Sequence, residues 1–127
     1  MQLDLTLLLI IALCGGAGAV LRLIADTLIA ARFGSRMPWG TITINLSGSF
    51  ALGLFTGFFA NSVPNQAWLL AIGTGLLGGY TTFSTASFDT VRLLKEGRAL
   101  ASLANAMGTL VGAIIAAYLG FLLATGF

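Results

Sequence analysis

The residues best suited to chemistry lie in one stretch, residues 73–88, which reads GTGLLGGYTTFSTASF. Its glycines are poor helix formers, and its hydroxyl side chains offer the backbone competing hydrogen bonds. The stretch lies within residues 67–88, an apolar segment long enough to cross a bilayer. A membrane helix that breaks there frees N–H and C=O groups, and such breaks bind ions in transporters and channels. The pattern predicts a broken membrane helix; an unbroken glycine-rich helix that packs closely on its neighbours is the alternative.

The second candidate is Asn45, in the apolar segment 40–60. It belongs to a stripe of small and polar residues at helical spacing, made of Thr41, Asn45, Ser49, Gly53 and Thr56. A carboxamide in a membrane helix is costly unless it is hydrogen-bonded. Two interpretations stay open: an amide N–H that is aimed at an anion, or an interhelical hydrogen bond that only holds the bundle together.

The first and last apolar segments each carry one more polar feature. Arg22 lies near the end of segment 4–24, either as a side chain that reaches the lipid head groups or as a cation that attracts anions at a pore mouth. Segment 100–124 carries a polar face with Ser102, Asn105 and Thr109. That face either packs on another helix or forms a polar track beside a pore.

The composition excludes several classes of protein. Of the 127 residues, 57% are hydrophobic and only 8% are charged, whereas soluble domains carry about 25% charged residues. The chain is therefore an integral membrane protein. It has no histidine and one cysteine, which leaves little material for metal cages or thiol catalysis, so we do not expect an enzyme. The net charge of +2 without a clustered basic patch does not indicate nucleic-acid binding.

The apolar segments predict an all-α membrane protein whose single domain spans residues 1–127, with transmembrane helices at about 4–24, 40–60, 67–88 and 100–124. Four short helices enclose too little interior for a pathway of their own, so a homodimer surrounded by membrane lipid is expected. Basic residues of the connecting loops all fall on one side of the membrane, and the positive-inside rule then places both termini outside.

Three stretches resemble the Fluc family of small fluoride channels, also called the CrcB family. They are GGAGAVLR at 15–22, PWGTITINLSG at 38–48 and GGYTTFSTAS at 78–87. The resemblance implies an antiparallel, dual-topology homodimer with two pores, through which cytoplasmic fluoride leaves passively across the inner (plasma) membrane. It also implies that the broken third helices cross at the dimer centre, where backbone carbonyls of Gly78 and Thr81 hold one structural Na⁺.

By the same resemblance, Asn45 and Phe83 lie in the pore and Arg22 in its vestibule. Fluoride holds its water tightly, so a pore must replace the hydration shell with donors, and Asn45, Thr41, Ser84 and Thr85 offer N–H and O–H groups. The electropositive edge of an aromatic ring can also face an anion. The expected fluoride pathway is therefore made of Asn45, Phe83, Ser84, Thr85, Ala86, Thr41, Arg22 and Thr109.

Position 86 departs from the family pattern, which reads TTFSTF. Ala86 stands where a second phenylalanine is expected. Phe88 is five residues from Phe83 and points elsewhere on a helix, so it is not an obvious replacement.

The competing interpretation is a small dimeric multidrug or proton-coupled transporter, which also has four helices. That class needs a carboxylate embedded in the membrane. The acidic residues fall at the ends of the predicted spans or in loops, which disfavours it; they are Asp4, Asp26, Asp89 and Glu96. A subunit that only supports assembly would leave the polar stripes and the broken helix without a purpose.

Overall fold

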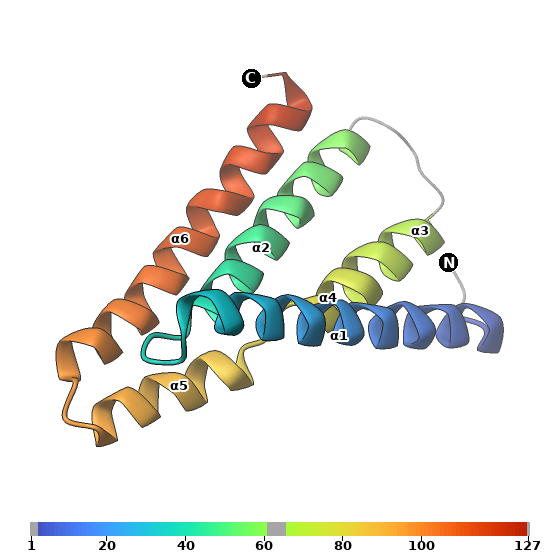
Figure 1. Ribbon diagram of the computed structural model, residues 1–127. Coiled ribbons are helices and arrows are strands. Elements are labelled where there is room, and N and C mark those ends of the chain that lie inside the picture. Colours follow the sequence, from blue (N-terminus) through green and yellow to red (C-terminus); the bar gives the residue numbers. More distant parts are fainter. Residues whose placement is uncertain (1–2, 61–65, 127) are drawn as a thin grey trace.

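The computed structural model describes residues 3–60 and 66–126, and every regular element in this part of the chain is helical. The predicted all-α fold is confirmed. In chain order the elements are α1 (Leu5–Phe33), α2 (Trp39–Phe59), α3 (Gln66–Trp68), η1 (Leu69–Leu77), α4 (Gly78–Tyr80), α5 (Ser84–Lys95) and α6 (Ala99–Thr125). Figure 1 shows the long helices α1, α2 and α6 with the shorter elements packed between and beneath them. Helices α1, α2 and α6 are long and apolar enough to cross a membrane.

Helix α1 is longer than the segment predicted from hydropathy. It begins after Asp4, whose Oδ1 accepts a hydrogen bond from the amide of Leu7 at 2.7 Å and so caps the first turn. No glycine or proline follows Ile24 until Gly34, where a positive φ of 77° ends the helix. As a result, Asp26 lies within α1, which continues past the predicted segment to Phe33.

Helices α2 and α6 run side by side along most of their length (Figure 1). Glycines from both helices make this approach possible. A Cβ built on Gly53 would overlap the carbonyl oxygen of Ala117, and one built on Gly120 would overlap that of Phe50. The backbones therefore touch directly, as small residues permit between membrane helices.

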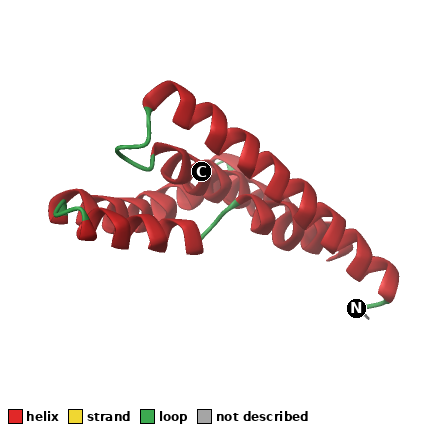
Figure 2. Ribbon diagram, turned by 60° about the horizontal axis from the view of Figure 1, so that its bottom comes forward, coloured by secondary structure: helices red, strands yellow, loops and turns green. Residues whose placement is uncertain are grey.

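The third apolar segment begins as a continuous run of helix, α3, η1 and α4, in which the nine residues of η1 are wound as a π-helix. This run packs on α1, which lies across it in Figure 1, and Figure 2 shows α1 as a long helix that begins near the N-terminus. Here too the contact is between backbones, because a Cβ on Gly18 would overlap the Leu76 carbonyl oxygen and one on Gly79 that of Gly15. The glycine-rich stretch thus does pack closely.

The same stretch also breaks. The helix stops at Thr81, which is extended with ψ 160°, and α5 begins only at Ser84. The predicted break is confirmed and lies at residues 81–83. Helix α5 then continues beyond the predicted span to Lys95, and a turn with Gly97 at φ 74° leads into α6.

Candidate ion pathway

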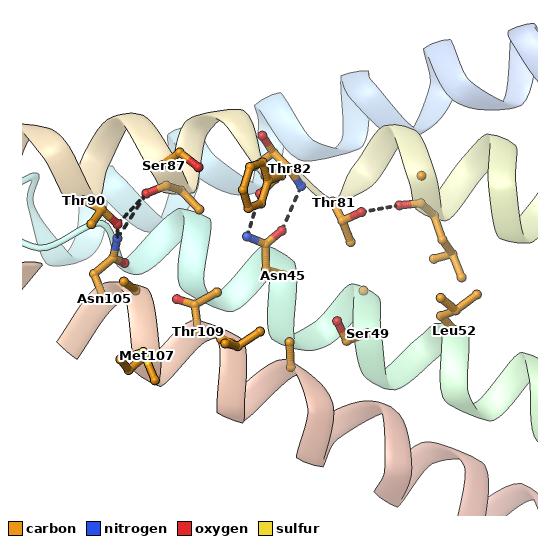
Figure 3. A pocket seen from close by; sticks show the side chains of 18 of the residues that line it. Asn45, Ser49, Leu52, Thr81, Thr82, Ser87, Thr90, Asn105, Met107 and Thr109 are labelled. Atoms are coloured by element: carbon orange, nitrogen blue, oxygen red, sulfur yellow. Dashed lines mark hydrogen bonds between the residues drawn. The ribbon is translucent and has the colours of Figure 1, made fainter. Parts of the chain in front are cut away.

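Asn45 of α2 bridges the break in the third segment. Its Nδ2 donates to the carbonyl oxygen of Thr82 at 2.8 Å, and its Oδ1 accepts from the amide of Thr82, also at 2.8 Å (Figure 3). Because a backbone N–H can only donate and a C=O can only accept, this pair determines which way the carboxamide points. Both residues are buried. Asn45 therefore supplies the two hydrogen-bond partners that the break removes from the helix.

The pair with Thr82 leaves part of the Asn45 amide free. A carboxamide has two N–H donors, and Nδ2 forms a single hydrogen bond within the described chain, the one to Thr82. Asn45 also lines the larger of two cavities. The interhelical hydrogen bond is thus present in the structure, and a second N–H remains for a ligand. That this N–H meets an anion stays a prediction.

Thr82 organises the hydroxyl groups at the start of α5. Its Oγ1 accepts from the amide of Thr85 at 3.2 Å and donates to Thr85 Oγ1 at 3.1 Å, and it lies 3.4 Å from Ser84 Oγ. A side-chain oxygen that accepts from the amide three residues on satisfies one of the free donors of a helix start. Thr82 was noted in the sequence only as one hydroxyl among several. Thr82 organises this region because its backbone is hydrogen-bonded to Asn45, which is remote in sequence.

The larger cavity, of about 710 Å³, lies against the break, α2, α5 and α6. Four of the predicted pathway residues line it: Asn45, Phe83, Ala86 and Thr109. Phe83 is 88% exposed. Phe88 does not line this cavity, in agreement with its expected direction on the helix. Positions 83 and 86 therefore do share one surface, as their spacing predicts.

The smaller cavity, of about 320 Å³, contains three other predicted residues, Arg22, Thr41 and Thr85. Thr82 lines both cavities, so the bridge to Asn45 lies where they meet. Ser84 lines neither of them. Seven of the eight predicted pathway residues thus fall into two groups, one for each cavity, and Thr82 borders both cavities.

Both signs of charge surround the smaller cavity. Arg22 and Asp26 both line it, yet neither takes part in an ion pair within the described residues. The Asp26 carboxylate instead lies directly against Gly40, in the first turn of α2. A helix N-terminus favours a negative charge, so this position suits an acid.

A second acid, Asp89, is hydrogen-bonded to Thr41, which lines the smaller cavity. Thr41 Oγ1 donates to Asp89 Oδ2 at 3.3 Å, and the other oxygen of Asp89 accepts from Arg92 at 3.4 Å. Arg92 also pairs with Glu96 at 3.2 Å. The polar wall of the smaller cavity is therefore connected to the charged end of α5.

The two carbonyls expected to hold Na⁺ have lost their helical donors. In a continuous α-helix the amide of Thr82 would donate to Gly78 and the amide of Thr85 to Thr81. Here the amide of Thr82 donates to Asn45, and that of Thr85 donates to Thr82 Oγ1. Free backbone carbonyls are suitable ligands for a hard cation. The described residues contain no group of His, Cys, Asp and Glu side chains that could hold a metal, so a cation would depend on the backbone.

Apolar helices that can cross a membrane, arranged around a broken helix with buried polar side chains, define a small multi-pass membrane protein. A family model described as CrcB-like protein, Camphor Resistance (CrcB), matches residues 9–121. The chain belongs to this family, and the resemblance inferred from the motifs is confirmed.

Curated relatives support the same assignment. The chain is 43% identical over 112 residues to "Fluoride-specific ion channel FluC 1" of Leifsonia xyli, with 88% of this chain and 82% of the relative covered. It is 41% identical over 117 residues to "Fluoride-specific ion channel FluC" of Solibacter usitatus, with 91% of this chain and 96% of the relative covered. It is 39% identical over 117 residues to the protein of that name from Mesorhizobium japonicum, with 92% and 94% covered.

Proposed function

We propose that this chain is a fluoride channel that lets cytoplasmic fluoride leave passively through two pores of an antiparallel homodimer in the inner membrane. The observation that carries the proposal is the similarity, at about 40% identity over most of the chain, to proteins named fluoride-specific ion channels. Those names describe ion channels, which also supports the expectation that the chain is not an enzyme.

The two cavities suggest how fluoride would move. Arg22 attracts the anion into the smaller cavity, where hydroxyls such as Thr41 replace part of its water. The ion then passes the bridge between Asn45 and Thr82 and meets the free N–H of Asn45. In the larger cavity, which Thr109 also lines, the ring edge of Phe83 faces it next. Chloride is larger and would gain less from these closely spaced donors.

A second copy of the chain would complete the larger cavity. An almost fully exposed Phe83 on the wall of a cavity is unusual for a finished pore, because one side of the ring has no protein around it. In an antiparallel dimer, the partner would cover this face and its own break would come near the first. The carbonyls of Gly78 and Thr81 would then hold Na⁺, which supplies a fixed positive charge near the anion path.

A proton-coupled transporter remains the second candidate, because Asp26 lies within α1 and lines the smaller cavity. A carboxylate in that position is the feature that such transporters need. However, Asp26 lies against Gly40 in the first turn of α2, where a helix N-terminus favours a negative charge, so its place has a structural explanation that needs no transport role.

One experiment separates the two candidates. The full chain is purified, reconstituted in liposomes loaded with fluoride or chloride, and efflux is followed with ion electrodes, with and without a proton gradient. The proposal predicts fast fluoride efflux that needs no proton gradient and far slower chloride efflux. Fluoride efflux that stops without a proton gradient would instead support the transporter.

A further inference from the structure

Polar side chains of α6 hold α5 in place. Ser102 Oγ donates to the carbonyl oxygen of Thr90 at 2.7 Å. One turn further along α6, Asn105 Nδ2 donates to Thr90 Oγ1 at 2.9 Å and to the carbonyl oxygen of Ala86 at 3.3 Å (Figure 3). Thr90 Oγ1 in turn donates to the same Ala86 oxygen at 2.8 Å. Asn105 is 1% exposed, so these contacts are shielded from solvent and lipid.

The hydrogen bond from Asn105 to the Ala86 carbonyl oxygen connects α6 to position 86, which lines the larger cavity together with Phe83. A phenylalanine at position 86 would anchor itself through the packing of its ring. The methyl group of Ala86 makes far fewer contacts, so the position of this turn of α5 depends more on hydrogen bonds to its backbone. Asn105 supplies the only one that comes from another helix in the described chain.

Asn105 also differs from Ser102 in what it leaves unpaired. Its Oδ1 is buried without a hydrogen-bond partner, and so is Oγ1 of Thr109, one turn further along. Both residues line the larger cavity. An unpaired buried acceptor is costly, and native proteins keep one mainly where it serves a purpose. Ser102 shows that α6 can hold α5 without this cost, so holding the helices together does not by itself explain Asn105.

We infer that Asn105 is a positioning residue that holds Ala86, and with it Phe83, at a set distance from α6 and thereby sets the preference for fluoride over chloride. This inference rests on the proposed function, because it assumes that the larger cavity conducts the ion. It goes beyond that proposal in assigning the width of the pathway at position 86 to a hydrogen bond made by α6.

The test compares Asn105→Leu with the matched control Ser102→Ala, each alone and together with Ala86→Phe. Asn105→Leu is close in size but has no donor, and we expect it to reduce the ratio of fluoride to chloride efflux about tenfold, the effect expected from losing the hydrogen bond to Ala86. A phenylalanine at position 86 anchors itself, so Ala86→Phe should restore most of the ratio. Ser102→Ala should change the ratio less than about twofold, since its partner is Thr90.

Assembly is checked by size-exclusion chromatography. If Asn105→Leu does not assemble, Asn105→Ala serves in its place, because it also removes the donor to the Ala86 carbonyl oxygen. An unchanged ratio in the variant that assembles would overturn the inference. So would an equal effect of Ser102→Ala, which would mean that both residues only hold the helices together. Both of these results would leave the proposed function intact. The proposed function and this inference would fall together if the unaltered chain showed no fluoride efflux, or efflux that depends on a proton gradient.

Discussion

The pair α2–α6 and the segment from α3 to α5 are both rich in glycine, yet glycine has different consequences in the two regions. Between α2 and α6, Gly53 and Gly120 let two intact helices touch through their backbones. Gly18 of α1 and Gly79 of the third segment do the same between those two elements, but the third segment is wound as a π-helix and then breaks at residues 81–83.

The hydroxyl groups that follow the glycines explain the difference. Thr82 uses its side chain to receive the amide of Thr85, and its own amide and carbonyl pair with Asn45. In α6 the residues next to Gly120, Leu119 and Phe121, are apolar, so their side chains offer no hydrogen bond that competes with those of the helix. Glycine allows close contact in both regions, and the break occurs only where side chains can take over the backbone hydrogen bonds.

The largest expected effect comes from removing the donor that supports the break. Asn45→Asp replaces the N–H that pairs with Thr82 by an oxygen, and an ionised carboxylate also repels an anion. We expect fluoride efflux from liposomes to fall at least about a hundredfold, equivalent to roughly 2.7 kcal/mol. Ser49→Ala, on the same stripe of α2, is the control and should retain efflux. Efflux that survives in Asn45→Asp would assign Asn45 to helix packing alone.

The broken region should also respond to sodium. If carbonyls of Gly78 and Thr81 hold Na⁺ in the dimer, bound Na⁺ stabilises the folded dimer by about 2.7 kcal/mol when its concentration is a hundred times the Kd. The Tm of the purified protein should therefore rise when N-methylglucamine is replaced by Na⁺ at constant ionic strength. The same Tm in both salts would argue against the cation site.

The glycine-packed region should be sensitive to size and insensitive to sodium. Gly120→Ala places a methyl group against the Phe50 carbonyl, whereas Gly108→Ala, in the same helix, places one where no atom lies within 4 Å. We expect the first variant to lose about 2 kcal/mol of stability through overpacking, with a lower Tm, and the second to lose none. Equal Tm values for the two variants would show that α2 and α6 are less tightly packed than in this structure.

The smallest expected effect is at position 86. If a ring edge gains from fluoride about what aromatic pairs gain from each other, about 0.5–1.5 kcal/mol, Ala86→Phe should raise fluoride efflux by roughly two- to tenfold. Phe83→Ala should lower it by more, because the remaining wall would then contain no ring at either position. Equal rates for the unaltered chain and Ala86→Phe would show that position 86 does not face the ion.

Much of this arrangement follows from local patterns. Runs of apolar residues predict the helices, and the glycines and hydroxyls of residues 73–88 predict a break, because these properties depend on residues close in sequence. The end of α1 was less predictable. Hydropathy falls after Ile24, but nothing stops the helix until Gly34, so helix length and apolar length differ.

The sequence by itself determined that this protein is a bundle of apolar helices with one broken segment, since composition and local propensity are sufficient for that. Only the tertiary structure decided which groups satisfy the break and which line a common surface. Asn45 meets Thr82, Arg22 shares a cavity with Thr41 and Thr85, and Asn105 reaches Ala86. These residues are far apart in sequence, and the packing of the helices, set by backbone contacts at glycines, brings them together.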